Sequence, residues 1–151
     1  MELRSSSLAD GAPMDRRHAW PDCGGANLSP GLSWTGAPPG TASFVVSCFD
    51  IDAPRGWWHW MLYDLPAAAT EIPEGGPLPD GTVETSNSFR AAGWGGPCPP
   101  PGKPHRYVFT VHALPDEHLP ARPRADPGEV SRMATARALD AASLTATFRT
   151  P

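Results

Sequence analysis

The chain contains 151 residues, of which 40% are hydrophobic and 19% are charged, a composition that favours a folded core over disorder. Its formal charge of −4 and pI of about 5.6 exclude a general electrostatic attraction to nucleic acid or to anionic membranes. No apolar run is long enough to span a membrane, and the first residues do not resemble a signal peptide. We therefore expect one domain over residues 1–151, located in the cytoplasm.

The predicted strands are bounded by turns rich in proline and glycine. In chain order they are Leu32–Trp34, Ser43–Asp50, Trp57–Leu65, His105–Leu114 and Leu144–Thr150. Ser43–Asp50 is rich in Val and Phe and ends shortly before Pro54, where the missing N–H group would interrupt strand pairing. Short strands separated by long turns predict a mostly all-β fold, either a sandwich or a barrel.

One helix is predicted before the last strand. Asp126 is suited to cap its first turn, Pro127 to be its first residue and Glu129 to complete a capping box. We expect this helix to continue to about Asp140. The residues at helical spacing on its apolar side are Val130, Met133, Ala134 and Arg137. This stripe is narrow, which indicates a supporting helix at the side of the β-fold.

The three cysteines are Cys23, Cys48 and Cys98, which are far apart in the sequence and form no CxxC pair. An odd number of cysteines without close spacing predicts neither a disulfide framework nor a thiolate zinc site. We expect all three to be buried, reduced thiols.

Two ionisable residues lie at the ends of apolar rows. Because side chains alternate along a strand, Asp50 ends the apolar face of its strand, and His105 begins a face that continues with Tyr107. Side chains at the rim of a core are partly desolvated, so their protonation depends strongly on their neighbours. A carboxylate beside histidine would favour the imidazolium, which with the tyrosine hydroxyl could donate hydrogen bonds to a phosphate, sulfate or carboxylate.

The strand Trp57–Leu65 is apolar on both faces, as is typical of a strand inside a sheet. Counting in twos places His59 with Trp57 and Met61. The opposite face is then formed by Trp58, Trp60 and Leu62. We expect His59 to reach the same rim as the other ionisable residues.

Structural roles remain open for these candidates on the pattern alone. Asp50 could cap the turn before Pro54, and a histidine at the end of a strand is often held by hydrogen bonds. His18 and His118 have the pattern of surface residues. The glycines at positions 93, 95 and 96 would allow backbone N–H groups to approach an anion.

Five motifs occur at and around the candidate residues. They are Asn27–Trp34 (NLSPGLSW), Pro39–Phe44 (PGTASF), Asp50–Pro54 (DIDAP), Trp58–Trp60 (WHW) and Gly95–Tyr107 (GGPCPPPGKPHRY). In this order and at this spacing they resemble the phosphatidylethanolamine-binding protein (PEBP) family, and within it the bacterial and archaeal branch similar to Raf kinase inhibitor protein.

The resemblance implies a β-sandwich of two antiparallel sheets with Greek-key connections and a small anion-accepting pocket at one end. The ligand-binding positions that it implies are Asp50, Trp57, His59, Gly96, Pro97, Pro99, His105 and Tyr107. No cofactor is implied. No metal is expected either, because the aspartate and the histidines lie on separate predicted elements without the spacing of a metal motif.

Two positions depart from the family pattern. Ile51 stands where the DPDAP signature has proline, which restores a backbone N–H group and relaxes the φ angle after Asp50. Trp94 stands where many bacterial relatives have tyrosine. With Trp57 and Trp58 beside His59, it predicts a more hydrophobic pocket mouth and a bulkier apolar ligand.

Three functions follow as hypotheses. The first is a regulatory binding protein for an anionic or polar small molecule, or for a modified side chain of a partner protein. The second is a cofactor-independent isomerase, lyase or cyclase that uses Asp50 with His59 or His105 as acid and base. The third is a kinase or protease inhibitor that acts through its outer surface. The oligomeric state is left open, with a homodimer among the alternatives.

Overall fold

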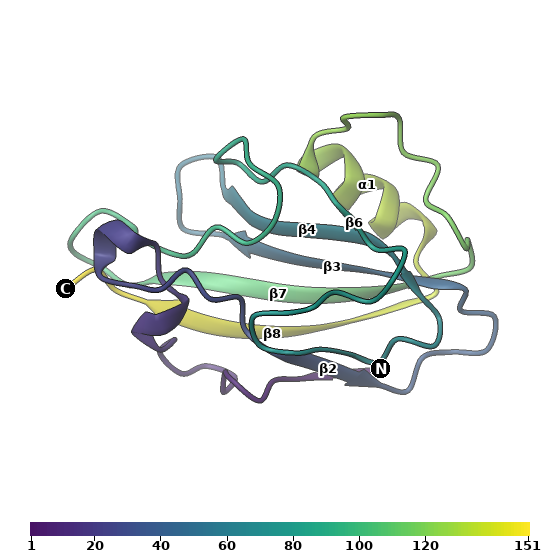
Figure 1. Ribbon diagram of the computed structural model, residues 1–151, viewed down its shortest axis with the longest axis horizontal. Coiled ribbons are helices and arrows are strands. Elements are labelled where there is room, and N and C mark those ends of the chain that lie inside the picture. The colour runs from purple at the N-terminus through teal and green to yellow at the C-terminus, as the bar shows by residue number, and fades with distance from the viewer.

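The computed structural model describes residues 1–151 as two antiparallel β-sheets and one α-helix (Figure 1). The large sheet has the strand order β6 (Val83–Glu84), β4 (Trp57–Pro66), β3 (Ser43–Asp50), β7 (His105–Leu114) and β8 (Asp140–Phe148). The small sheet has the order β1 (Glu2–Arg4), β2 (Leu32–Thr35) and β5 (Glu71–Ile72). The remaining elements are the 3-10 turns η1 (Arg16–His18) and η2 (Pro21–Cys23) and the helix α1 (Pro127–Arg137). The predicted β-sandwich is confirmed.

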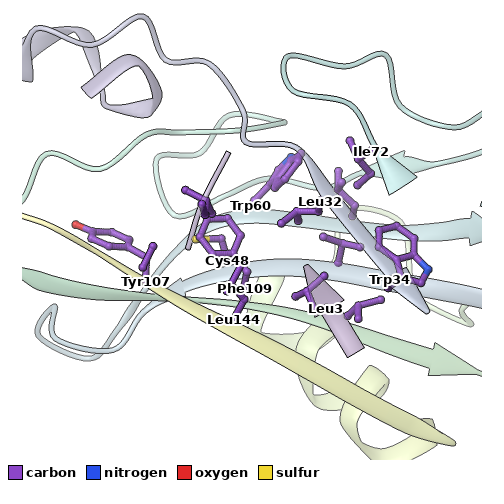
Figure 2. Packing of buried hydrophobic residues seen from close by; sticks show 14 of the residues in the cluster. Leu3, Leu32, Trp34, Cys48, Trp60, Ile72, Tyr107, Phe109 and Leu144 are labelled. Carbon is purple, nitrogen blue, oxygen red and sulfur yellow. The ribbon is translucent and has the colours of Figure 1, made fainter. Parts of the chain in front are cut away.

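The main core lies between the two sheets (Figure 2). Trp34 of β2 packs edge-on against Phe44 of β3, with ring centroids 5.4 Å apart. Further side chains of this cluster include Leu3, Leu32, Cys48, Trp60, Ile72, Phe109 and Leu144. Because hydrophobic burial is worth about 25 cal/mol per Å² of apolar surface, this layer of aromatic and aliphatic side chains holds the sandwich together.

Helix α1 covers the opposite face of the large sheet (Figure 1). The Asp126 carboxylate accepts a hydrogen bond of 2.9 Å from the N–H group of Glu129, as expected of an N-cap. The Glu129 carboxylate, however, pairs with Arg122 and does not complete the predicted capping box. The helix ends at Arg137 and not near Asp140, because Asp140 already pairs with β7 as the first residue of β8.

Irregular pairing between β3 and β4 changes the predicted faces of β4. Cys48 pairs with Trp60, whereas Phe49 pairs with Trp58, so His59 has no partner on β3. An extra residue of this kind forms a β-bulge, after which the alternation of side chains is shifted. The residues that face the main core or a cavity at the end of the sheet are Trp57, His59, Trp60 and Leu62, and those that pack toward the helix are Trp58 and Met61. The expectation of strict alternation along this strand was wrong.

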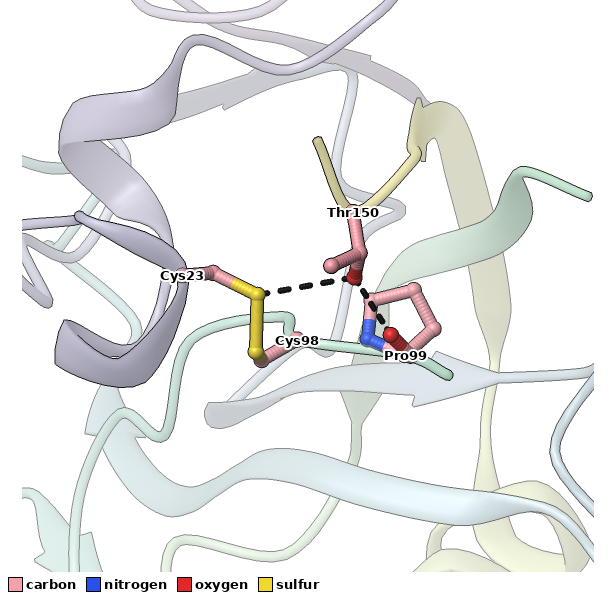
Figure 3. Close-up of a disulfide and its surroundings, with 4 residues drawn as sticks. All are labelled: Cys23, Cys98, Pro99 and Thr150. Atoms are coloured by element: carbon pink, nitrogen blue, oxygen red, sulfur yellow. Dashed lines mark hydrogen bonds between the residues drawn. A yellow bond between two sulfur atoms is a disulfide. The ribbon is translucent and has the colours of Figure 1, made fainter. Parts of the chain in front are cut away.

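Cys23 and Cys98 form a disulfide, which corrects the expectation that all three thiols are reduced (Figure 3). Their Cα atoms lie 5.6 Å apart, although the residues are separated by 75 positions in the sequence. The hydroxyl of Thr150 donates to the carbonyl of Pro99 and lies 3.5 Å from the sulfur of Cys23. Cys48 is a buried free thiol, as expected. The pair could not be seen in the sequence because folded loops bring the two cysteines together.

The two histidines predicted at the surface differ in their environment. His118 is exposed, as expected, but the His18 side chain is fully buried. The Nδ1 atom of His18 lies 2.8 Å from the carbonyl oxygen of Leu28, and the carbonyl of His18 accepts a hydrogen bond from the Trp94 indole. His18 is thus a structural residue that joins η1 to two other loops.

Candidate functional site

A cavity lies at the end of the large sheet where β3 ends and where β4 and β7 begin. Asp50, the last residue of β3, pairs with Trp57 on one side and with Tyr107 on the other. The cavity has a volume of about 230 Å³. Its lining residues are Asp50, Ala53, Pro54, Trp57, His59, Phe89, Cys98, Pro99, Pro100, His105 and Tyr107. Strand register alone therefore brings five of the sequence-predicted residues to one place.

Asp50 and His105 form a hydrogen-bonded pair in this cavity. The Nδ1 atom of His105 lies 2.7 Å from one carboxylate oxygen of Asp50, and both side chains are largely buried. The other carboxylate oxygen accepts hydrogen bonds from the N–H groups of Asp52 at 2.9 Å and Ala53 at 3.2 Å. The carboxylate accepts a hydrogen bond from the N–H group at Nδ1. The Nε2 atom is therefore the ring nitrogen that remains for a ligand.

His59 is fixed by a similar contact with the backbone. Its Nδ1 atom lies 2.6 Å from the carbonyl oxygen of Gly95, and because a carbonyl only accepts, Nδ1 carries the proton. Burial lowers the pKa of His59, while the bond to Gly95 and the charge of Asp50 oppose this change only in part. The charge of Asp50 thus favours the imidazolium form of His59, as expected of a nearby carboxylate, but desolvation by burial has the larger effect on its pKa.

Tyr107 supplies a neutral hydroxyl at the cavity. The side chain is buried, and Figure 2 shows its hydroxyl directed away from the core cluster. Burial, and then the charge of Asp50, raise the pKa of Tyr107 far above its usual value. Its ring packs edge-on against that of His59, with centroids 5.1 Å apart. The hydroxyl therefore remains a hydrogen-bond donor at neutral pH.

Phe89 forms a wall of the cavity that the sequence did not indicate. Its ring packs edge-on against Trp57 and His59, with centroids 5.2 Å and 5.4 Å away, and stacks on Trp20 at 5.1 Å. The buried Asn87 holds this loop by accepting a hydrogen bond of 2.9 Å from the N–H group of Phe89. The only signal for this residue is an aromatic side chain in a turn-rich loop, outside every predicted strand.

Two predicted residues, Gly96 and Pro97, lie outside the cavity lining, whereas Pro99 lies within it. The N–H group of Gly96 donates to the side-chain oxygen of Asn27 at 2.7 Å, and that of Gly95 donates to the carbonyl of His59. A Cβ atom at position 96 would lie 2.2 Å from the carbonyl oxygen of His18. Gly96 therefore permits close loop packing, and neither of these two N–H groups is free for an anion.

Asp50, His59 and His105 are the titratable groups of the cavity besides the tyrosine. No group of three or more His, Cys, Asp or Glu side chains gathers closely enough to hold a metal ion. No lysine or arginine contributes to the lining. The chemistry of the site therefore depends on two imidazoles, one carboxylate and one hydroxyl.

Comparison with known proteins identifies the fold family. A family model described as phosphatidylethanolamine-binding protein matches residues 4–149. The chain belongs to the phosphatidylethanolamine-binding protein family. Among PEBP relatives, YbhB of Escherichia coli K12 is 41% identical, with 98% of this chain and 99% of YbhB covered. A protein of Methanothermobacter thermautotrophicus is 36% identical, with 99% of both chains covered.

Solved structures give the same result for the PEBP fold. The crystal structure of E. coli YbcL, described as a new member of the mammalian PEBP family, has a TM-score of 0.93 and 38% identity, covering 98% of this chain and 97% of YbcL. A putative PEBP homolog from Chlamydia trachomatis has a TM-score of 0.86 and 26% identity, covering 99% and 97% of the two chains.

The departures from the PEBP pattern have clear structural places. The N–H group of Ile51, which proline would lack, donates to the carbonyl of Arg106 at 3.2 Å. Trp94 is not part of the cavity lining but packs behind it, with its ring centroid 6.4 Å from that of His59. The aromatic mouth of this PEBP cavity is therefore formed by Trp57 and Phe89, not by Trp94.

Proposed function

We propose that this protein binds a small molecule with an anionic, phosphate-type or otherwise polar group, and that occupancy of the cavity has a regulatory role. The observation that carries the proposal is the 2.7 Å contact between Asp50 and His105. This contact orients the imidazole of His105, so that its Nε2 atom can form a hydrogen bond with the ligand. The Tyr107 hydroxyl and the Nε2 atom of His59 complete the polar end.

The rest of the ligand is expected to be apolar. Trp57 and Phe89 line the cavity together with three prolines, and Phe89 is held in place by the stack on Trp20. The cavity volume of about 230 Å³ equals roughly eight water-sized volumes of about 30 Å³ each. This space exceeds that of a single phosphate group, which supports a ligand with an apolar substituent.

The balance of charge predicts how binding depends on pH. Without lysine or arginine in the lining, an anion must be held by imidazolium and hydroxyl donors. Burial lowers the pKa of His59, so this histidine gains its proton only below the usual value of 6.5. We therefore expect the Kd for phosphate to fall as the pH is lowered from 8 toward 5.5.

A thermal unfolding experiment with inorganic phosphate tests the proposal. A ligand that binds only the folded state raises the Tm, and the increase grows with ligand concentration. We expect millimolar phosphate to raise the Tm of the wild type but not of Asp50→Ala or His105→Gln. His118→Gln, which changes an exposed histidine far from the cavity, is the matched control and should respond like the wild type. Equal shifts in all four proteins would refute the proposed site.

A second candidate function is acid–base catalysis, and the hydrogen bonding of the two histidines favours it. Both have Nδ1 occupied by an acceptor, which leaves Nε2 for proton transfer, and burial keeps His59 in its free-base form near neutral pH. Nitrobenzisoxazole is a suitable probe because its ring opens when a base removes the carbon-bound proton. Turnover by the wild type that is lost in His59→Gln but kept in His118→Gln would support an enzyme, and equal rates would exclude it.

Two further predictions stay proposals. One core cluster spans both sheets, which supports one domain over residues 1–151.

The cytoplasmic location can be tested through the disulfide, because such bonds persist in oxidising compartments and are rare in the cytosol. No helix of the structure has the length and hydrophobicity to cross a membrane. Alkylation of intact cells would trap Cys23 and Cys98 as free thiols in the cytoplasm and leave them unmodified elsewhere.

A further inference from the structure

The turn between β3 and β4 is tied to the start of β7 by a pair of charged residues outside the cavity lining. The Asp52 carboxylate accepts hydrogen bonds from the Arg106 guanidinium at 3.0 Å and 2.9 Å, and from the Arg106 backbone N–H group at 2.7 Å. A bidentate contact between guanidinium and carboxylate fixes the orientation of both groups. Neither residue lines the cavity, but each is a direct neighbour in sequence of residues that do.

The backbone N–H group of Arg106 requires this partner because β3 has ended. The last residue of β3, Asp50, pairs with Tyr107. One position further, the N–H group of Ile51 still donates to the carbonyl of Arg106 at 3.2 Å. In an antiparallel pair the N–H group of Arg106 would donate back to the opposite strand. The Asp52 carboxylate takes the place of that strand acceptor, so a side chain continues the pairing of β3 with β7.

The same turn holds the carboxylate of the binding site. The backbone N–H groups of Asp52 and Ala53 donate to one oxygen of Asp50. The other oxygen of Asp50 lies 2.7 Å from Nδ1 of His105, which precedes Arg106 in the chain. The contacts therefore form a closed ring that leads from the Asp50 carboxylate through β7 and back to it. A change at the contact between Asp52 and Arg106 reaches the site from both sides.

No side chain of this turn is buried in the core. None of the residues from Ile51 to Gly56 is buried, and Ile51 is 44% exposed. An exposed ion pair adds little to stability, so the effect of this one lies in the orientation that it gives to the turn. The hydrogen bonds from Arg106 lower the pKa of Asp52 to about 2. The Asp52 carboxylate therefore stays ionised over the pH range in which histidines titrate.

We infer that Asp52 and Arg106 are positioning residues for the binding site. They hold the Asp50 carboxylate against Nδ1 of His105, so that Nε2 stays available to the ligand. The inference rests on the proposed function only where it concerns the ligand. In a neutral imidazole either nitrogen can carry the proton, and the hydrogen bond at one nitrogen decides which form is present. Without the pair, the turn relaxes, the carboxylate leaves Nδ1 and both forms become populated.

Long-range ¹H–¹⁵N NMR spectra of the imidazole rings test this inference, because they show which ring nitrogen carries the proton. At about pH 9, we expect His105 of the wild type to carry its proton on Nδ1. Asp52→Ala should populate the form with the proton on Nε2. Asp52→Asn keeps one oxygen as an acceptor and should populate it less. The matched control is Asp116→Ala, which breaks the bidentate pair of Asp116 with Arg137 near the opposite end of β3 and should keep the wild-type spectrum.

Two further measurements approach the pair from other sides. Arg106→Gln removes the guanidinium but keeps the backbone N–H group on Asp52, so its spectrum should lie between those of the wild type and Asp52→Ala. Asp52→Ala should also raise the Kd for inorganic phosphate about threefold to tenfold, because a misaligned imidazole loses a hydrogen bond to the ligand. Asp116→Ala should bind phosphate like the wild type.

The ring spectra decide the inference independently of phosphate binding. A His105 ring that keeps its proton on Nδ1 in Asp52→Ala would overturn the inference, and so would an equal change of the spectrum in Asp116→Ala. If Asp52→Ala does not fold, Asp52→Asn and Arg106→Gln provide the same test. Absence of phosphate binding to the wild type would refute the proposed function, whereas the spectra would still report on the pair.

Discussion

The two walls of the cavity are built in different ways. The strand wall consists of Asp50, Trp57, His59, His105 and Tyr107, on β3, β4 and β7. The loop wall consists of Phe89, Cys98, Pro99 and Pro100, in segments without regular structure. Pairing between neighbouring strands fixes the positions of the residues in the strand wall. The loop wall instead depends on individual interactions, such as the disulfide and the hydrogen bonds of Asn87. Damage to those links should therefore affect the loop wall while the polar residues keep their places.

The disulfide is the strongest of these links, and its loss should have the largest effect. It closes a loop over a sequence separation of 75 residues, for which the loss of the cross-link costs about 4 kcal/mol in the free energy of unfolding. We expect the double variant Cys23→Ser, Cys98→Ser to lose this amount in urea denaturation. Reductant should lower the stability of the wild type similarly and leave the double variant unchanged. If reductant has no effect on the wild type, the loop wall is held by its hydrogen bonds alone.

Asn87 is the link that holds Phe89. Its side chain accepts from the N–H groups of Phe89 and Ala91 and donates to the carbonyl of Gly93 at 3.0 Å. Asn87→Ala leaves these backbone groups without their partner, which should cost about 2–3 kcal/mol in unfolding experiments. The stronger binding expected for butyl phosphate over inorganic phosphate should disappear. Phe89→Ala should lose the same preference with a smaller stability cost, and a retained preference in both variants would show that Phe89 does not contact the ligand.

Acid should weaken the fold through buried histidines. Burial lowers the pKa of His18, His59 and His112 from 6.5, so the unfolded chain binds protons at a pH at which the native chain does not. The free energy of unfolding should therefore fall as the pH drops below about 7, by up to about 1.4 kcal/mol per pH unit for each histidine. His112→Leu should give a shallower decline in Tm between pH 7.5 and 5. An equal decline would assign the loss of stability to other groups.

The smallest effect is expected where the strand wall meets a loop. Ile51→Pro removes the hydrogen bond to the carbonyl of Arg106, which costs about 1 kcal/mol, but it also restricts the unfolded chain, which returns about 0.4–1 kcal/mol. The change in the free energy of unfolding should stay below about 1 kcal/mol, and phosphate binding should be unchanged. A large loss of binding would show that the bond at Ile51 positions Asp50.

The sequence predicted the strand wall because its information is local. β3 and β7 agree with the predicted Ser43–Asp50 and His105–Leu114, and their alternation places Asp50 and Tyr107 correctly. β4 was predicted as an element, but the bulge at His59 was not, because a bulge depends on the partner strand. The short strands β1, β5 and β6 were missed for the same reason, since only pairing with a neighbour makes such short segments extended.

By itself, then, the sequence determined the β-sandwich, the capped helix, the family and the polar residues at the end of the large sheet. Apolar alternation, turn residues and motif order are properties of neighbouring positions, and they can be read without a structure. Only the tertiary structure decided the Cys23–Cys98 bond, the burial of His18, the place of Phe89 and the pairing of Asp50 with His105 rather than His59. The first three depend on which loops meet in space, and the last depends on the register of β3 with β7; both are set by contacts between residues far apart in the chain.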